Sequence, residues 1–200
     1  MPRVSEEHLE RRRQQILDAA RVCFARKGFY DTSMQDVFAE AELSAGAVYR
    51  YFKSKNDIIA ALANQTAVPL MGLLTEQLDL DPLPTPGDLV QVIAQHVVDS
   101  SHTGGIVRLA PQAWALALVD PDAGGYVKEA MTGIRGFWQD YAVRMQAAGW
   151  LPADADPQAV GAAMFGVLPG FILQHLIVGD ISPESLAAGV RTLMPYGEPG

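Results

Sequence analysis

The sequence has little cysteine, no apolar leader and no long uninterrupted apolar run. Cys23 is the one cysteine among 200 residues, so no disulfide can form within the chain. The first fifteen residues carry charge in place of the apolar segment of an export signal, and we therefore expect a cytoplasmic protein. The longest apolar run, residues 159–173, is shorter than the roughly 20 residues that cross a bilayer, and it contains Pro169. We expect this run to form a buried helix and the chain to have no membrane partner.

Signatures of catalytic and metal sites are also missing from the sequence. There is no glycine-rich phosphate loop, no nucleophile elbow and no pair of carboxylates at catalytic spacing. His96, His102 and His175 do not stand at metal-ligand spacing from one another or from a carboxylate pair. We therefore expect a protein that is not an enzyme and that has no catalytic residue, no metal and no cofactor.

Positive charge is scarce overall but concentrated near the N-terminus. The formal net charge is −8, which by itself argues against a nucleic-acid partner. Residues 1–55, however, hold ten basic and eight acidic side chains, whereas residues 56–200 hold five basic and fifteen acidic ones. The basic surplus lies in the first part of the chain, so we expect any contact with DNA phosphates to be made there.

The apolar pattern of the chain is helical. Ile16, Ala20 and Phe24, for example, follow the i, i+4, i+8 spacing of one helix face. No stretch alternates apolar and polar residues as a half-buried strand does. Gly28 should end the first helix, and Pro69 should bend or interrupt the fourth. We expect an all-α fold of about nine helices, near residues 5–27, 34–41, 45–51, 55–78, 87–100, 105–119, 123–148, 157–178 and 183–194.

Two very short predicted helices joined by a tight turn carry the strongest functional signal. Ser44 is placed to cap the second helix, and Thr32 or Ser33 can cap the first; Thr32 and Gln35 also have the spacing of a capping box. The outer face of the second helix is small at its N-terminus and rich in hydrogen-bond donors further on. Such a face favours insertion into the major groove of DNA.

The residues of this region follow a specific pattern. It consists of Thr32-Ser33, Asp36-Val37, Ser44 and the run Val48-Tyr49-Arg50-Tyr51-Phe52-Lys53-Ser54-Lys55. From about Arg12 to Ile59 the chain thereby resembles the N-terminal helix-turn-helix of the TetR family of bacterial transcriptional regulators. The chain departs from the family pattern at Phe38, where a small residue is usual, and at Glu42, where glycine is usual. A positive φ at Glu42 would cost about 1 kcal/mol or more.

The resemblance implies a DNA-binding domain over residues 1–54 that contacts a palindromic operator in double-stranded DNA. The residues expected to hold phosphates, through hydroxyls, the ammonium group and the N-terminal backbone amides at Ser33 and Lys55, are Ser33, Ser44, Tyr49, Tyr51 and Lys55. Those expected to face base edges are Met34, Ala45, Gly46, Ala47 and Arg50. Alternatives stay open for several of them. The serines can serve only as helix caps, one tyrosine can pack in the core, and Arg50 can bind a phosphate instead of a guanine.

The remainder of the chain, residues 55–200, is rich in aromatic and sulfur-containing side chains. Most of them must form an ordinary core, but a helical domain of this composition can also leave a cavity between its helices. The resemblance implies such a cavity for a small apolar or amphipathic ligand. We expect polar contacts to the ligand from His96, Gln112 and His175, which are stranded in apolar runs. The other lining candidates are Trp114, Leu118, Met131, Trp138, Tyr141 and Phe165.

The helix expected near residues 157–178 is apolar nearly all round and must be buried on all sides. Small residues on one side permit close helix packing. The apolar area is supplied by Phe165, Leu168, Ile172 and Leu176. An interface between two copies of the chain explains this pattern, and the resemblance implies a homodimer.

Together these features predict a homodimeric transcriptional regulator, a repressor that leaves its operator when a ligand enters the larger domain. The alternative is a helical small-molecule carrier or interaction module whose DNA-binding motif is vestigial. Tight, salt-sensitive binding to one palindrome would distinguish the first hypothesis from the second.

Overall fold

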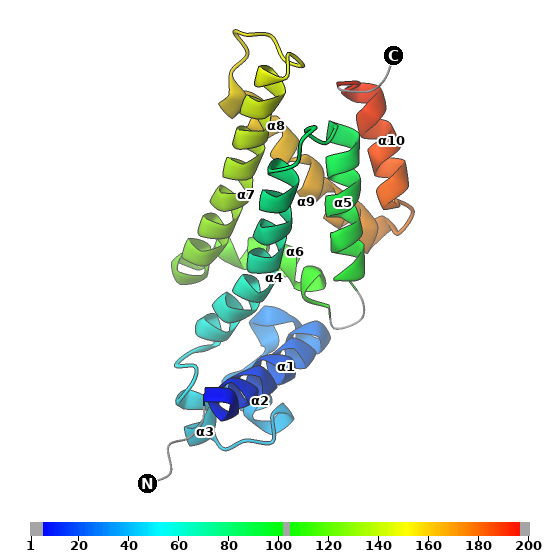
Figure 1. Cartoon of the computed structure of the whole chain (residues 1–200). Coiled ribbons are helices and arrows are strands. Elements are labelled where there is room, and N and C mark those ends of the chain that lie inside the picture. Colours follow the sequence, from blue (N-terminus) through cyan, green and yellow to red (C-terminus); the bar gives the residue numbers. More distant parts are fainter. Residues whose placement is uncertain (1–5, 102–104, 197–200) are drawn as a thin grey trace. The chain divides into compact units, whose positions relative to one another are not determined.

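The computed structural model describes residues 6–101 and 105–196 of the chain. These ranges are mostly helical and contain no strand, which confirms the predicted all-α fold (Figure 1). A 3-10 turn, η1 (Ile106–Leu109), precedes α6, and a π-helical turn, η2 (Gln174–Val178), follows α9. The helices are α1 (Glu6–Asp31), α2 (Met34–Glu40), α3 (Ala45–Tyr49), α4 (Lys55–Leu78), α5 (Pro86–Asp99), α6 (Ala110–Ala117), α7 (Pro121–Ala147), α8 (Pro157–Phe165), α9 (Val167–Leu173) and α10 (Pro183–Leu193).

The chain forms two compact units. Unit 1 comprises residues 1–66 and 103–127, and unit 2 comprises residues 67–102 and 128–200. Unit 1 therefore includes the start of α4, the whole of α6 and the first residues of α7, so this packing differs from the division predicted between residues 54 and 55. Leu109 explains the difference, because it is buried in the same core as α1, with Ala113 and Leu116 of α6 packed against that core.

The core of unit 1 is built around α1. Its regular part ends at Gly28, where φ is 79°, as the sequence predicted. Val37 from α2 and Val48 from α3 are fully buried against this helix, so both short helices are anchored by their inner faces. The buried cluster consists of Ile16, Leu17, Ala20, Phe24, Phe29, Val37, Val48, Phe52, Ile58, Ile59, Ala61, Leu62 and Leu109.

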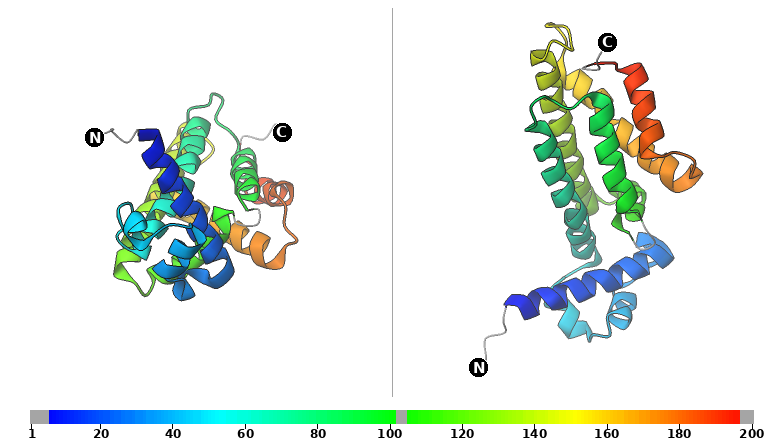
Figure 2. Two further views of the ribbon diagram at one scale, coloured as in Figure 1. Left: turned by 90° about the horizontal axis from the view of Figure 1, so that it is seen from below. Right: turned by 45° about the vertical axis from the view of Figure 1, so that its right-hand side comes forward.

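In unit 2, α5 and α10 run side by side (Figure 2). Arg191 of α10 donates to Asp88 of α5 at 2.6 Å, and this bond holds the pKa of Asp88 below its usual value. The interior is filled by large side chains that are almost completely buried, among them Leu89, Ile93, Trp138, Tyr141, Met145 and Phe171.

The structure corrects two details of the predicted helices. Residues 55–78 form one continuous helix, so Pro69 does not interrupt α4, and a bend at Pro69 stays a prediction. The segment expected as a single helix over residues 157–178 is broken at Gly166 into α8 and α9 and ends in the wide turn η2. By length and composition alone, residues 55–78 and 157–178 could each cross a membrane, a test that core helices of soluble proteins also pass. The apolar window of residues 157–178 is only 28% buried within one chain.

Candidate nucleic-acid interface

The first helix of the short pair, α2, begins with a reciprocal capping box. Ser33 Oγ accepts a hydrogen bond from the Asp36 N–H at 3.2 Å, and Asp36 Oδ2 accepts one from the Ser33 N–H at 2.8 Å. Lys27 Nζ lies 2.5 Å from Asp36 Oδ1. The bond to Lys27, together with those from Ser33, holds the pKa of Asp36 well below its usual range. The start of α2 is therefore fixed by a carboxylate that stays ionised.

The capping box predicted for Thr32 and Gln35 is wrong. Thr32 is 1% exposed, and its hydroxyl donates to the carbonyl of Gly28 at 2.7 Å instead of capping α2. Ser44 does cap the second helix of the pair, since its Oγ accepts from the Ala47 N–H at 3.3 Å. The two serines thus have the capping role that the residues alone allowed, and their contact with phosphates stays a prediction.

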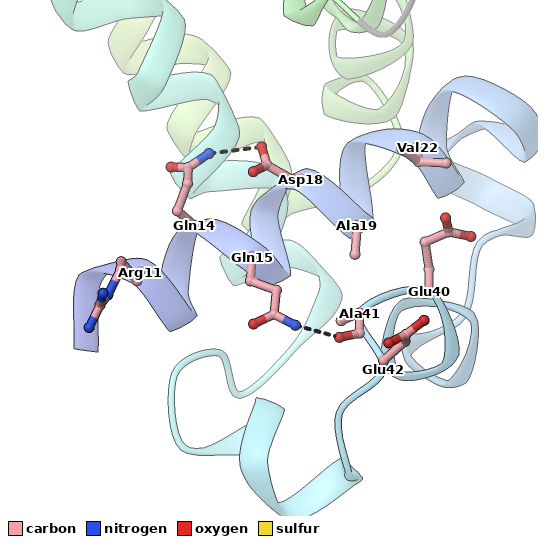
Figure 3. A pocket seen from close by; sticks show the side chains of 9 residues that line it. All are labelled: Arg11, Gln14, Gln15, Asp18, Ala19, Val22, Glu40, Ala41 and Glu42. Carbon is pink, nitrogen blue, oxygen red and sulfur yellow. Dashed lines mark hydrogen bonds between the residues drawn. The ribbon is translucent and has the colours of Figure 1, made fainter. Parts of the chain in front are cut away.

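The turn between α2 and α3 contains a left-handed residue. Glu42 has a φ of 53°, the one positive φ of a non-glycine residue in the described ranges. Gln15 of α1 braces this turn by donating from Nε2 to the Ala41 carbonyl at 2.8 Å (Figure 3). Both lie along a groove of about 520 Å³, in which Gln14 Nε2 donates to Asp18 Oδ1 at 2.9 Å. The side-chain amides of Gln14 and Gln15, which line the groove, donate hydrogen bonds within the chain. The Gln15 bond therefore serves to hold the turn.

The helix α3 has one buried face and one exposed face. Val48 and Phe52 are 0% and 4% exposed and lie in the core of unit 1. On the opposite side, Ala45, Gly46 and Arg50 are exposed, and no described residue bonds to the Arg50 guanidinium. A Cβ placed on Gly46 would meet no atom within 4 Å. The outer surface of α3 is therefore open to the close approach of another backbone or of a base edge.

Aromatic packing holds the end of α3. The Tyr49 ring is 41% exposed and makes an edge contact with Phe38 at 5.3 Å between ring centroids, which accounts for a large residue at position 38. Tyr51 is half-buried and packs against the core of unit 1, as one tyrosine was allowed to do. Met34 is also half-buried against that core, and Ala47 is half-buried. Of the predicted base-facing residues, these two are the least accessible.

The ammonium group of Lys55 is not free to hold a phosphate, which corrects the sequence-based prediction for this side chain. Its Nζ donates to the carbonyl oxygens of Phe29 at 2.6 Å, Thr32 at 2.9 Å and Tyr30 at 3.3 Å. An ammonium has three donors, and all three are used. Lys55 therefore fastens the start of α4 to the segment that leads into α2. Its backbone N–H, at the first residue of α4, is the part that stays available to a phosphate.

Lys53 and Asp57, for which no role was predicted from the sequence, hold the connection between α3 and α4. Lys53 Nζ donates to the Tyr49 carbonyl at 2.7 Å and so satisfies the end of α3. Asp57 Oδ2 accepts from the backbone N–H groups of Lys53 at 2.8 Å and Ser54 at 3.1 Å, while Ser54 Oγ accepts from the Asp57 N–H at 3.1 Å. The spacing of Ser54 and Asp57, just before an apolar run, is the sequence signal that indicates this cap.

The nine residues predicted to line a ligand cavity do not form one cluster. Gln112, Trp114 and Leu118 belong to unit 1, whereas the other six belong to unit 2. Gln112 Oε1 accepts from the Phe29 N–H at 3.1 Å, and Leu118 is 87% exposed. Gln112 therefore has a structural role in unit 1 and Leu118 lies on the surface of one chain, and a contact of either residue with a ligand stays a prediction.

Within unit 2, the predicted aromatic residues occupy different environments. Trp138 and Tyr141 are each 1% exposed, and their rings make an edge contact at 6.0 Å. Tyr141 Oη donates to the Pro84 carbonyl at 2.6 Å, and burial raises the pKa of its phenol. Trp138 Nε1, by contrast, is buried and has no partner among the described residues. Met131 and Phe165 are only half-buried.

The two histidines predicted to contact the ligand, His96 and His175, are separate from the Trp138 and Tyr141 rings. His96 lies in a shallow groove on α5 with Leu73 of α4. His175 Nε2 lies 3.0 Å from Ser101 Oγ, and its ring stacks on Phe171 at 5.7 Å. The Ser101 hydroxyl also lies 2.8 Å from the Val98 carbonyl oxygen, so it links His175 to the end of α5.

The four residues predicted for a dimer interface differ in their exposure within one chain. Leu168 and Ile172 are each 7% exposed within one chain, so they contribute to the core of unit 2, and their place in an interface stays a prediction. Phe165 and Leu176 are half-buried. The stripe that one chain leaves exposed, which we call the α8–η2 stripe, consists of Ala159, Ala162, Ala163, Gly166, Leu173 and Ile177.

Comparison with known proteins links the sequence to bacterial regulators. The family model described as "Bacterial regulatory proteins, tetR family" matches residues 16–62. An HTH-type transcriptional repressor of Mycobacterium tuberculosis is 42% identical over 65 residues, which make up 32% of this chain and 35% of that protein. The HTH-type transcriptional regulator TtgR of Pseudomonas putida is 25% identical over 187 residues, or 90% of this chain and 87% of that protein.

The similarity of fold extends over nearly the whole chain. SmeT, a repressor of Stenotrophomonas maltophilia whose structure was solved as a complex with triclosan, matches with a TM-score of 0.72 at 20% identity, over 92% of this chain and 91% of that one. The chain covers only 35% and 28% of the length of the first two curated relatives. Residues 16–62 therefore match the TetR family of bacterial regulatory proteins, and the fold of nearly the whole chain is similar to that of SmeT.

Proposed function

We propose that the chain is a cytoplasmic transcriptional repressor that binds a palindromic operator as a homodimer and leaves it when a small ligand binds unit 2. The exposed face of α3 carries this proposal. It presents small side chains at its start and the unpartnered guanidinium of Arg50 at its end, while its inner face is anchored in the core. A short helix that is rigidly held and open on its outer side suits the major groove.

The residues of this face have distinct proposed roles. Arg50 donates to the O6 and N7 atoms of a guanine, a contact that distinguishes one base pair from another. Ala45 and Gly46 permit close approach to base edges. Tyr49, which is 41% exposed and supported by Phe38, donates to a phosphate. The backbone N–H of Lys55 binds a second phosphate, since the ammonium of this residue is engaged elsewhere.

The proposed dimer is supported by the α8–η2 stripe. Four of its six members are alanine or glycine, which allow helices to pack closely. Ile177 is 75% exposed in one chain, which is unfavourable for so large an apolar side chain unless another surface covers it. A second copy, related by a two-fold axis, presents the same stripe and covers it.

The proposed ligand acts by a shift of populations. A ligand that binds one conformation of the dimer more tightly increases the share of that conformation. In the ligand-bound conformation, the distance between the two α3 helices no longer matches one turn of DNA, ~34–36 Å, and the affinity of the dimer for the palindrome falls. Binding of triclosan by SmeT, which has the same fold at 20% identity, supports an apolar or amphipathic small molecule as the ligand class.

The proposal is tested by footprinting and gel-shift measurements on DNA that flanks the chain's own gene. We expect protection of one palindrome, binding that weakens steeply as salt rises, and random DNA bound much more weakly. Arg50→Ala serves as the matched control, because it removes the guanidinium and leaves the inner face of α3 intact. Binding with no preference for any sequence would favour the alternative of a carrier or interaction module with a vestigial motif.

A further inference from the structure

Gln35 of α2 presents a side-chain amide that unit 1 does not use. The sequence suggested that Gln35 pairs with Thr32 in a capping box, but α2 is capped by Ser33 and Asp36 instead. Gln35 is exposed, and no residue that the structure describes bonds to its side chain. Its hydrogen-bonding groups are therefore open to a partner from outside the chain.

Two sides of α2 are occupied by unit 1 itself. Val37 is fully buried in the core. Asp36 and Glu40, four residues apart on one side of the helix, face α1. Asp36 Oδ1 lies 2.5 Å from Lys27 Nζ. Glu40 Oε2 lies 3.3 Å from a guanidinium nitrogen of Arg26. A partner from outside can therefore approach α2 only from the side that remains.

The remaining side of α2 adjoins the exposed face of α3, its neighbour within unit 1 (Figure 1). Gln35 and Ala39 lie on this side, four residues apart and both exposed. Phe38, three residues after Gln35, borders it and makes the edge contact with Tyr49 of α3 at 5.3 Å. Gln35 and the exposed Tyr49 therefore flank Phe38 on one surface. Ala39 bears only a methyl group, so it lets another molecule approach this surface closely.

The amide of Gln35 matches one base edge better than it matches a phosphate. It offers an N–H donor and a carbonyl acceptor side by side. In the major groove, adenine presents the complementary pair, the N7 acceptor and the N6 amino donor, whereas guanine presents two acceptors and suits Arg50. A phosphate has only acceptors and would use the N–H donor alone.

We propose that Gln35 reads an adenine in each half-site of the operator, donating from Nε2 to N7 and accepting with Oε1 from the N6 amino group. The inference rests on the proposed operator binding, and it adds a specificity-determining residue on α2 to those on α3. Each half-site then contains an adenine–thymine pair that α2 recognises, besides the guanine that Arg50 recognises.

Operator DNA with 7-deazaadenine at single positions tests this inference on the full chain. The analogue lacks the N7 acceptor but still pairs with thymine. We expect it to weaken binding of the wild-type protein about 3- to 10-fold at one adenine of each half-site, as one neutral hydrogen bond allows. Gln35→Met keeps the length of the side chain but has no amide, so in this variant the analogue should have no effect at that adenine.

Gln95→Met is the matched control, because it makes the same change at an exposed glutamine of α5, in unit 2. It should keep the wild-type affinity for the operator and the wild-type response to the analogue. Gln35→Met should unfold at the wild-type temperature, since Gln35 is exposed and unbonded within the described part of the chain. If Gln35→Met does not fold, Gln35→Ala takes its place in the same comparison.

The inference would be overturned if no adenine were sensitive to the analogue, or if the analogue weakened binding of Gln35→Met as much as that of the wild type. It would also be overturned if Gln35→Met lost affinity equally for operator and random DNA, which would assign the amide to a phosphate. A chain that protects a palindrome but gives one of these results would refute the role of Gln35 alone. A chain that protects no palindrome would refute the proposed repressor, and this inference with it.

Discussion

Gln112 Oε1 accepts a hydrogen bond from the backbone N–H of Phe29 at 3.1 Å, and so joins two residues that are 83 positions apart. Phe29 follows Gly28, where the regular part of α1 ends, and a Cβ at Gly28 would lie 3.3 Å from the same Gln112 oxygen. The bond fastens α6 to the end of the helix that supports α2 and α3. Within unit 1, α6 is therefore tied to the end of the helix against which α2 and α3 pack.

Gln112→Leu should loosen this attachment. The substitution leaves the Phe29 N–H without an acceptor in a largely buried place, which we expect to lower the free energy of unfolding of unit 1 by about 1–3 kcal/mol. Amide hydrogen exchange at Phe29 measures the local effect. Gln112→Glu is the control, because a carboxylate oxygen can still accept the bond. Unchanged protection of the Phe29 amide in Gln112→Leu would show that the bond contributes nothing.

Glu42→Gly should stabilise unit 1. Glu42 has a φ of 53°, a conformation that costs a residue with a Cβ about 1–2 kcal/mol and costs glycine little. The greater freedom of glycine in the unfolded chain offsets part of the gain, so we expect a net increase of up to about 1 kcal/mol in thermal or urea unfolding. Glu42→Ala removes the charge but keeps the strain, and it should show no such gain. A destabilised Glu42→Gly would mean that the carboxylate matters more than the backbone.

Arg50→Ala should relax sequence preference as well as weaken binding. A lost contact to guanine costs about 1–3 kcal/mol and affects one position of the operator more than the others. Affinities for the operator and for variants with each base pair changed measure the effect. Tyr49→Phe is a useful comparison, since a phosphate donor lost there should weaken all sequences about equally. A uniform loss in Arg50→Ala as well would assign its guanidinium to a phosphate.

Lys55→Met should act mainly on stability. Because Nζ is bound to three backbone carbonyls, its loss frees the segment before α2, and we expect easier unfolding of unit 1 with little change in the salt dependence of DNA binding. Lys53→Met is the control, since Nζ of the exposed Lys53 makes a single bond, to Tyr49. A stable Lys55→Met that flattened the salt slope by about one unit would restore the phosphate role that the sequence alone suggested.

The helices and the exposed face of α3 could be predicted because local signals determine them. Ser44 caps α3, Gly28 ends the regular part of α1, and the apolar residues of each helix keep the spacing of one face. The positive φ at Glu42 could also be suspected, from the departure at a position where the family pattern has glycine.

The sequence carries no sign of the contacts made by side chains whose partners lie far along the chain. The distant carbonyls that bind Lys55, and the backbone N–H that binds Gln112, leave no trace in the local pattern. Leu168 and Ile172 were predicted for the interface because a helix apolar on all sides has no sequence mark that separates its inner side from its outer side. Small residues are the better indicator, since the side that one chain leaves exposed is mostly alanine and glycine.

This distinction changes the test of the dimer. Ile172→Glu would place a charge in the core of unit 2 and unfold it, so it cannot report on an interface. Ala163→Glu and Ile177→Glu change exposed members of the α8–η2 stripe and should leave each chain folded. Two copies that meet there would bury the added charges, and we therefore expect both variants to be monomeric in analytical ultracentrifugation and to lose operator binding.

Val143→Glu supplies the matched control for the dimer test. Val143 is 51% exposed on α7, outside the stripe, so the same added charge should leave both the dimer and operator binding intact. Loss of the dimer in all three variants would point to a general effect of charge and not to the stripe. If the wild-type chain sediments as a 21.6 kDa monomer at micromolar concentration, the proposed dimer interface is refuted. That result would also refute binding to a palindromic operator. Two α3 helices can bind half-sites ~34–36 Å apart only when a two-fold axis relates the two chains.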